Sequence, residues 1–208
     1  MGGELPKQFI SLKGKAILYY SVLPFLEAYD DLQVIVVLPA AFMEKGQKIL
    51  DNFHDKDRIQ ITAGGDTRFQ SVKNGLSLIK DESVIFVHDA VRCLVSIELI
   101  QRCYTKALYT GSAIPVVPSK DSVRLMTSNG SEIFDRTKVM LVQTPQTFLS
   151  KVILPAFNVD YKDSFTDEAT VVESTGIKVS LVDGDENNIK ITRPIDLKIA
   201  ENLLEKEN

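Results

Sequence analysis

Short apolar runs alternate along this chain with longer segments whose apolar residues are spaced as on a helix. The run Val84 to Val87 is continuously apolar and predicts a strand buried on both faces, because such strands lose the alternation of buried and exposed positions. Apolar residues three or four positions apart predict amphipathic helices instead. These patterns predict strands at residues 33–38, 58–62, 84–87, 113–117 and 178–182, and helices at residues 15–29, 40–53, 66–79, 96–109, 167–174 and 194–205.

The order of these elements predicts the class of fold. A strand followed by a helix recurs along the chain, which is typical of βαβ units with right-handed crossovers and a parallel sheet. We therefore expect an α/β fold with a Rossmann-like, doubly wound, mostly parallel sheet. Residues 1–208 are enough for one such domain and do not require a second.

One segment interrupts the alternation. Residues 118–148 contain two strand-like stretches, 122–127 and 132–142, with Asn129-Gly130 between them. Asn-Gly in that position is the strongest short signal for a hairpin. Because a lone hairpin is marginally stable, we expect a β-arm that protrudes from the sheet and docks on a second subunit, which gives a homodimer.

Composition and charge exclude several function classes. The net charge of −4 and the pI near 5.3 argue against binding to nucleic acid or to a membrane surface, since both require a basic face. No apolar run approaches ~18 residues, so we expect no membrane span. The start of the chain lacks a secretory pattern, so we expect a cytoplasmic protein. Cys93 and Cys103 lack metal-ligand spacing and are expected to be small buried side chains.

Candidate chemistry lies where predicted strands end. His88, Asp89 and Arg92 directly follow the strand 84–87, and open α/β sheets bind ligands at the carboxyl ends of their strands. Asp89 or Ser96 could instead be the N-cap of the next helix, and His88 is expected to be hydrogen-bonded rather than catalytic. Residues 63–71 offer glycines at a helix N-terminus, which is an anion cradle or simply a capped turn. The cations that could converge at this edge are Lys7, Arg68, Arg92, Arg136, Lys190 and Arg193.

Six segments, in order, resemble one family. They are PKQF at residues 6–9, AGGDTRFQS at 63–71, VHDAVR at 87–92, DRTKVMLVQTPQTF at 135–148, TDEA at 166–169 and NIKITRPIDL at 188–197. Together they resemble the 2-C-methyl-D-erythritol 4-phosphate cytidylyltransferases over essentially the whole chain. The resemblance implies a nucleotidyltransferase-type fold and an enzyme of the non-mevalonate isoprenoid pathway. Such an enzyme joins CTP to the polyol phosphate 2-C-methyl-D-erythritol 4-phosphate and releases pyrophosphate. It would use Mg²⁺ held largely by phosphate oxygens, and its protein ligands to the metal are unknown.

The resemblance also implies roles for three cations. Lys7 would stabilise charge on the triphosphate, and Lys190 would hold the α-phosphate and help to place the nucleophile. Arg136, on the predicted arm, would position the methylerythritol phosphate in the site of the neighbouring subunit.

Further positions would bind the two substrates by the same resemblance. The nucleotide would be contacted by Gly65, Asp66, Ser71, Asp89, Ala90 and Lys190. The polyol phosphate would be contacted by Arg92, Ser122, Arg136, Thr144 and Thr166. Ser122 stands where the family usually has Thr.

The sequence departs from the family pattern at two places, and alternatives remain open. The family begins with a strand and a glycine-rich loop that carries a catalytic Arg just before a Met. Met1 corresponds to that Met, so the strand, the loop and the Arg are missing from this sequence, which either starts late or belongs to a truncated protein. Cys93 replaces the Pro that usually follows Arg92. The alternatives are a ribitol 5-phosphate cytidylyltransferase and a truncated, non-catalytic nucleotide-binding dimer.

Overall fold

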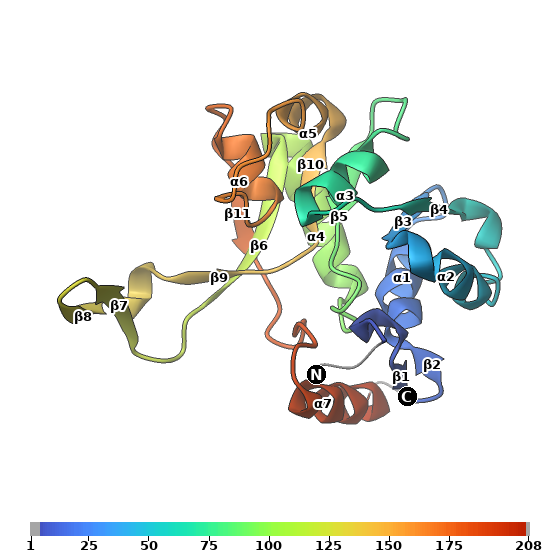
Figure 1. Cartoon of the computed structure of the whole chain (residues 1–208), viewed down its shortest axis with the longest axis horizontal. Coiled ribbons are helices and arrows are strands. Elements are labelled where there is room, and N and C mark those ends of the chain that lie inside the picture. The colour runs from blue at the N-terminus through green and yellow to red at the C-terminus, as the bar shows by residue number, and fades with distance from the viewer. Residues whose placement is uncertain (1–4, 207–208) are drawn as a thin grey trace.

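The centre of the protein is a five-stranded sheet with helices on both faces (Figure 1). The computed structural model describes residues 5–206. The strands are β1 Ser11–Leu12, β2 Lys15–Ala16, β3 Val34–Leu38, β4 Ile59–Ala63, β5 Val84–Val87, β6 Ser112–Pro118, β7 Val123–Thr127, β8 Gly130–Phe134, β9 Met140–Val142, β10 Gln146–Leu149 and β11 Leu181–Asp183. The α-helices are α1 Ile17–Ala28, α2 Met43–Leu50, α3 Arg68–Leu76, α4 Ile97–Thr110, α5 Ser150–Ala156, α6 Glu168–Glu173 and α7 Pro194–Lys206. Short 3-10 helices are η1 Lys7–Phe9, η2 Ala40–Phe42, η3 Lys56–Arg58 and η4 Arg136–Lys138.

The α/β class and most of the predicted elements are confirmed. The strand expected at residues 84–87 is β5, and the strand expected at 178–182 begins later, as β11. Residues 15–16, expected to be helical, form β2 instead, and the structure adds β10 and α5, which the pattern did not predict.

The prediction of a mostly parallel sheet is wrong. In the order β11-β6-β10-β5, only β11 pairs with β6 in parallel, whereas β10 is antiparallel to both β6 and β5, and β9 is antiparallel to β6. The reason is the excursion between β6 and β10. The chain leaves along β6, turns through the β7–β8 hairpin, and returns beside β6 without a crossover helix, so the returning strands run in the opposite direction. A separate parallel pair is formed by β3 and β4.

Apolar clusters on the two faces of the sheet hold the layers together. On one face, Phe148 of β10 packs among side chains of α3, α5 and α6, and on the other face Phe86 of β5 packs among side chains of α1 and α4. Along β5, Ile85 and Val87 belong to the first cluster, whereas Val84 and Phe86 belong to the second. Successive residues of β5 therefore face opposite clusters, as expected for a strand buried on both sides. Cys93 and Cys103 are buried as predicted, and burial raises the pKa of their thiols to about 11 and about 12.

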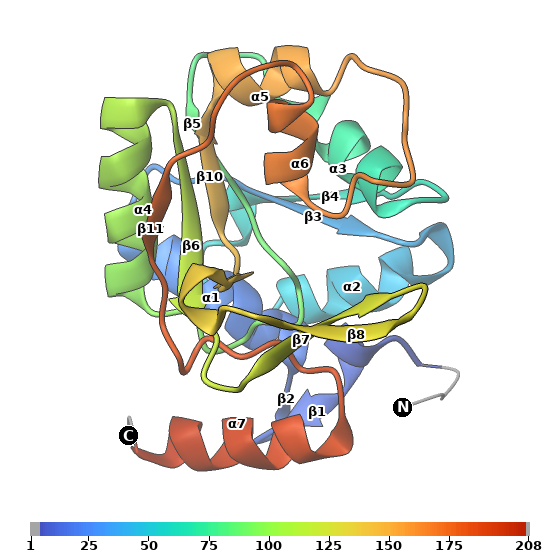
Figure 2. The ribbon, with the colours of Figure 1, turned by 90° about the vertical axis from the view of Figure 1, so that its left-hand side faces the viewer.

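In the described part of the chain, no strand pairing joins the β3–β4 pair to the five-stranded sheet, and in Figure 2 β3 and β4 run across the direction of β6 and β10. Among the described residues, β5 pairs only with β10 and β3 only with β4, so each strand has one edge without a strand partner. These edges, together with α1 and α3, line a cavity of about 1060 Å³, which we call the sheet groove. Its walls are mainly apolar side chains, such as Val37, Val72 and Phe86.

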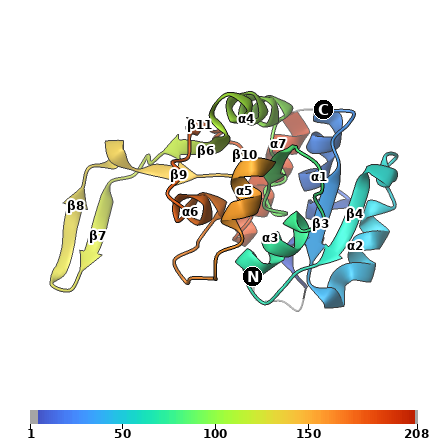
Figure 3. The same cartoon turned by 90° about the horizontal axis from the view of Figure 1, so that it is seen from above.

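The β7–β8 hairpin extends away from the layered body (Figure 3). Thr127 pairs with Gly130 across the turn, and Gly130 has φ +127°, a conformation that favours glycine. The side chains of Met126 and Ile133 are each 83% exposed. No helix in the described part of the chain is long and apolar enough to cross a membrane.

Candidate active site

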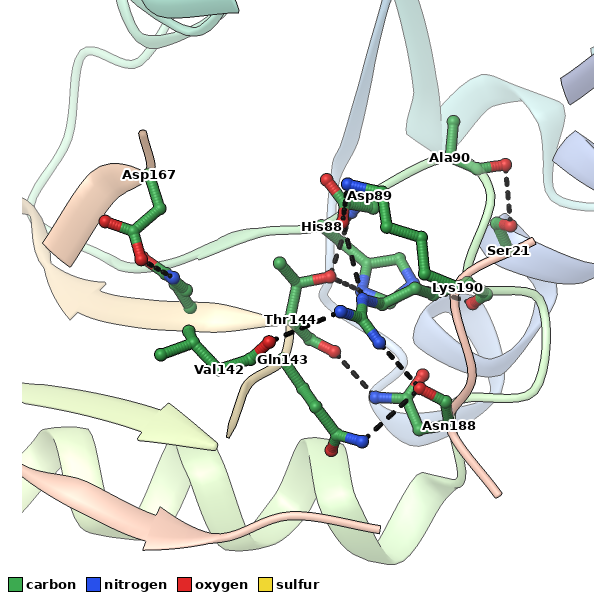
Figure 4. Close-up of polar contacts among 12 residues, drawn as sticks. Ser21, His88, Asp89, Ala90, Val142, Gln143, Thr144, Asp167, Asn188 and Lys190 are labelled. Atoms are coloured by element: carbon green, nitrogen blue, oxygen red, sulfur yellow. Dashed lines mark hydrogen bonds and ion pairs between the residues drawn. The ribbon is translucent and has the colours of Figure 1, made fainter. Parts of the chain in front are cut away.

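Asp89 is the centre of a cluster of three cations at the carboxyl end of β5, and Figure 4 shows one of them, Lys190, beside it. Lys190 Nζ lies 3.0 Å from Asp89 Oδ2, Arg92 Nε lies 3.4 Å from the same oxygen, and Arg68 Nη2 lies 3.7 Å from Oδ1. Burial alone would raise the pKa of Asp89, but Lys190, Arg68 and Arg92 hold it below its usual value. Asp89 is therefore ionised at neutral pH.

His88 links the end of β5 to Thr144 and fixes the loop that carries Asp89. The Asp89 backbone N–H donates to Thr144 Oγ1 at 3.0 Å, and that hydroxyl lies 3.0 Å from His88 Nδ1. His88 Nε2 lies 2.9 Å from the Arg92 carbonyl oxygen, which can only accept. Nε2 therefore carries the proton, and Thr144 donates to Nδ1. Burial lowers the pKa of His88 to about 4, so the ring is neutral at pH 7. The prediction that His88 is hydrogen-bonded is confirmed.

The loop that carries Lys190 is tied to the segment between β9 and β10. Arg92 Nη1 donates to the Asn188 carbonyl oxygen at 2.7 Å, and Asn188 Nδ2 donates to the Thr144 carbonyl oxygen at 2.8 Å. Gln143 exchanges two hydrogen bonds with the Asp185 backbone. These contacts join parts of the chain more than forty residues apart and place Lys190 over Asp89.

A cleft of about 200 Å³ opens over this cluster. It is lined by three cations and by hydroxyl, amide and carboxyl groups, and we call it the cationic cleft. Its lining residues are Arg68, Asp89, Arg92, Val142, Gln143, Thr144, Gln146, Thr166, Asp167 and Lys190. The lining contains three cations and two carboxylates, Asp89 and Asp167, so its net positive charge favours an anionic ligand, which the hydroxyl and amide groups can orient.

The structure brings part of the predicted site together. Asp89, Arg92, Thr144, Thr166 and Lys190 all line the cationic cleft. Lys7 does not line it, but its Nζ donates to the Thr192 carbonyl oxygen at 3.0 Å, two residues after Lys190.

Three residues predicted to contact the nucleotide lie where the chain enters α3: Gly65 and Asp66 on the preceding loop, and Ser71 in the first turns of the helix. The Gly65 backbone N–H donates to Ser71 Oγ at 3.1 Å, and Ser71 Oγ donates to the Thr67 carbonyl oxygen at 2.9 Å. Gly65 and Asp66 are exposed, and Ser71 lines the sheet groove. Ala90 also lines the groove, and its carbonyl oxygen accepts a hydrogen bond from Ser21.

Two predicted site residues lie apart from the cleft. Ser122 is exposed next to the hairpin, and Arg136 Nη1 donates to the Lys120 carbonyl oxygen at 2.8 Å, also on the arm segment. Of the other candidate cations, Arg68 joins the cluster, whereas Arg193 pairs with Asp196 and is mostly exposed.

Gln143, Asn188 and Glu168 also hold the site in place, although they were not predicted from the sequence. Glu168 is fully buried and binds Arg68 through both carboxylate oxygens. An acidic residue in the first turn of a helix is ordinary, so the local pattern gave no signal for this contact.

The fold and the cleft define a class of protein: an α/β protein with a cleft lined by cations at the carboxyl end of β5. Comparisons with known proteins narrow the class. A sequence model of the family "2-C-methyl-D-erythritol 4-phosphate cytidylyltransferase" matches residues 1–206. A protein of that description from Phocaeicola vulgatus is 43% identical over 204 residues, which cover 98% of this chain and 93% of that protein.

Solved structures agree with the sequence comparison. A 2-C-methyl-D-erythritol 4-phosphate cytidylyltransferase from Francisella tularensis is similar with a TM-score of 0.80 at 31% identity, covering 95% of this chain and 93% of that one. A 4-diphosphocytidyl-2C-methyl-D-erythritol synthase from Anaerococcus prevotii has a TM-score of 0.86 at 25% identity, covering 98% and 92%. This chain belongs to the 2-C-methyl-D-erythritol 4-phosphate cytidylyltransferase family. The absence of a first strand stays a prediction.

Proposed function

We propose that this chain transfers the cytidylyl group of CTP to 2-C-methyl-D-erythritol 4-phosphate and releases pyrophosphate. The observation that carries the proposal is the convergence of Arg68, Arg92 and Lys190 on one cleft of a chain whose net charge is −4. Membership of the family supports the identity of both substrates.

The chemistry suits residues that supply charge rather than a general base. A phosphate oxygen of the polyol phosphate forms a bond to the α-phosphorus of CTP, and the bond from that phosphorus to the bridging oxygen breaks. Pyrophosphate leaves with the electron pair. The attacking phosphate is already ionised near pH 7, because its second pKa is about 6. Catalysis then depends on positioning and on stabilising the spread negative charge.

Lys190 is the cation best placed for that stabilisation. Its side chain is 46% exposed, and in this structure its partner is Asp89. An arriving phosphate can compete for Lys190, since Arg92 remains to balance Asp89. We propose that Lys190 holds the α-phosphate, that Lys7 contacts the triphosphate nearby, and that Arg92, Thr144 and Thr166 contact the polyol phosphate.

The cytosine would lie beside the loop before α3. Gly65 and Asp66 are exposed there, and the Gly65–Ser71 hydrogen bond fixes the shape of the loop. Backbone and side-chain groups of Gly65, Asp66 and Ser71 would then distinguish cytosine from other bases, and Asp89 and Ala90 would meet the ribose and the neighbouring phosphates.

Mg²⁺ fits this donor set as a substrate-bound ion. The described residues contain no group of three or more His, Cys, Asp and Glu side chains that could hold a metal by themselves. Mg²⁺ commonly takes one or two carboxylates together with substrate phosphates and water. The ionised Asp89 would supply a carboxylate, and the bound ion would neutralise charge on the triphosphate.

We also propose that the protein is a homodimer whose arm completes the site of the partner subunit. Arg136 and Ser122 lie away from the cationic cleft of their own chain. The hairpin exposes Met126 and Ile133, apolar surface that a second subunit would cover. A cytoplasmic location stays a prediction from the sequence.

The test is CTP turnover with purified protein and Mg²⁺. We expect pyrophosphate release with 2-C-methyl-D-erythritol 4-phosphate, and much slower release with ribitol 5-phosphate. A preference for ribitol 5-phosphate would replace the substrate assignment. Binding of CTP without turnover of either polyol phosphate would contradict the proposed activity and favour a non-catalytic nucleotide-binding protein.

A further inference from the structure

Glu168 is a buried carboxylate that none of the proposed roles uses. It is the first residue of α6, it is 0% exposed, and its neighbour Ala169 belongs to an apolar cluster. Burying an ionised group is unfavourable, and apolar residues of similar size often serve stability as well or better. A role in the site would account for a charge at this position.

The partner of Glu168 is Arg68, one hundred residues earlier in the chain. Arg68 Nη1 donates to Glu168 Oε1, and Nη2 donates to Oε2 at 2.9 Å. Burial raises the pKa of Glu168, but the Arg68 guanidinium, which donates to both carboxylate oxygens, favours the ionised form, and the fork-like contact fixes the plane of the guanidinium.

Arg68 connects this buried carboxylate to the Asp89 cluster. Its Nη2 atom lies 3.7 Å from Asp89 Oδ1, whereas Lys190 and Arg92 contact the other carboxylate oxygen, Oδ2. The side chain of Arg68 is 42% exposed, so solvent leaves it room to move. Without Glu168, the nearest carboxylate to Arg68 would be Asp89, and the two would pair closely.

We propose that Glu168 is a positioning residue that acts through Arg68. It holds Arg68 back from Asp89, so that Asp89 remains the partner of Lys190 and Arg92 and the cations keep the arrangement that receives the phosphates. This proposal rests on the proposed function for its kinetic test, but its structural consequence can be measured separately.

The kinetic test is Glu168→Gln, which keeps the size of the side chain and removes its charge. We expect kcat to fall about 10-fold or more, with KM for both substrates changed less than about 3-fold, because the cations remain present but are misplaced. Glu173→Gln is the matched control, since Glu173 is an exposed acid on the same helix. An unchanged kcat for Glu168→Gln would overturn the proposal.

A double variant separates positioning from a merely structural effect. If Glu168 acts through Arg68, then Arg68→Met with Glu168→Gln should be no slower than Arg68→Met alone. Additive losses would overturn the proposal. The double variant removes both charges of the pair, so it is expected to fold even if Glu168→Gln does not. Wild-type kcat in the double variant would also overturn the proposal.

A crystal structure of the Glu168→Gln variant tests the same idea without any activity. We expect Arg68 within hydrogen-bond distance of Asp89 and Lys190 displaced from it. Unchanged positions of Arg68 and Lys190 would overturn the positioning role. If the wild-type protein turns over neither polyol phosphate, the proposed function fails, and this structural result still decides the role of Glu168.

Discussion

Two cavities of this protein, the sheet groove and the cationic cleft, differ in size and lining. The sheet groove has a volume of about 1060 Å³ and lies between strand edges and apolar helix faces, whereas the cationic cleft has about 200 Å³ and is lined mostly by polar side chains. They meet at Arg68 and Asp89, which line both.

The comparison shows that the volume of a cavity does not indicate whether it can bind a charged ligand. Thr144 lines the cleft and is hydrogen-bonded to His88 and Asn188 beside it, so the loops that carry Asp89 and Lys190 have fixed positions. The groove is lined mainly by apolar side chains of β3, β5, α1 and α3. A small cleft with fixed cations can bind a phosphate, because binding depends on placed charges and not on space.

The largest expected effect tests the cleft directly. Lys190→Ala should lower kcat/KM about 10²–10³-fold, because one cation that stabilises the transferring phosphate is lost. Folding should be unchanged, since Lys190 is partly exposed. The measurement is pyrophosphate release together with thermal unfolding. Lys198→Ala, an exposed lysine on α7, is the control and should keep wild-type turnover. Equal turnover for both variants would remove Lys190 from the site.

The second prediction tests whether Arg136 of one subunit completes the cationic cleft of the other. Arg136→Ala should lower turnover about 10²-fold, although Arg136 lies on the arm. If Arg136 acts in the partner's site, refolding an equal mixture of Arg136→Ala and Lys190→Ala chains should restore about a quarter of wild-type activity, because mixed dimers then have one intact site. No recovery in the mixture would place Arg136 outside the partner's site.

The third prediction concerns His88, beside the Asp89 loop. Its pKa is lowered to about 4 in the folded protein, below the unfolded value of about 6.5. Between these values the unfolded chain binds more protons, so the free energy of unfolding should fall as pH is lowered from about 6.5 to 4, by up to about 3 kcal/mol.

Urea unfolding at several pH values measures this dependence. His88→Gln should flatten it between pH 6.5 and 4, whereas His54→Gln, at an exposed position, should leave it unchanged. If the His88→Gln variant keeps the full pH dependence, the neutral ring is not its source.

The smallest expected effect tests the groove. Val72 lines the groove and is half-buried, whereas Val172 is 0% exposed in the core. Val172→Ala should lower the free energy of unfolding by about 2 kcal/mol, and Val72→Ala by less than half of that, because its side chain already borders open space. Chemical denaturation measures both values. Equal losses would show that the groove is packed in solution.

The sequence by itself determined the local elements and the order of the chemistry-bearing residues. The apolar run of β5 and the abrupt change to His88 and Asp89 follow from positions adjacent in the chain. The Asn129-Gly130 signal likewise predicted where the hairpin turns, because turn conformation depends on neighbouring residues.

The tertiary structure decided how strands pair and which charges meet. The antiparallel return of β9 and β10 depends on the route of the connection, which hydrophobic periodicity does not encode. The contact of Glu168 with Arg68, and of Lys190 with Asp89, spans about one hundred residues. Their energies arise only when burial removes water and folding brings the groups together, so neither contact is visible in a local pattern.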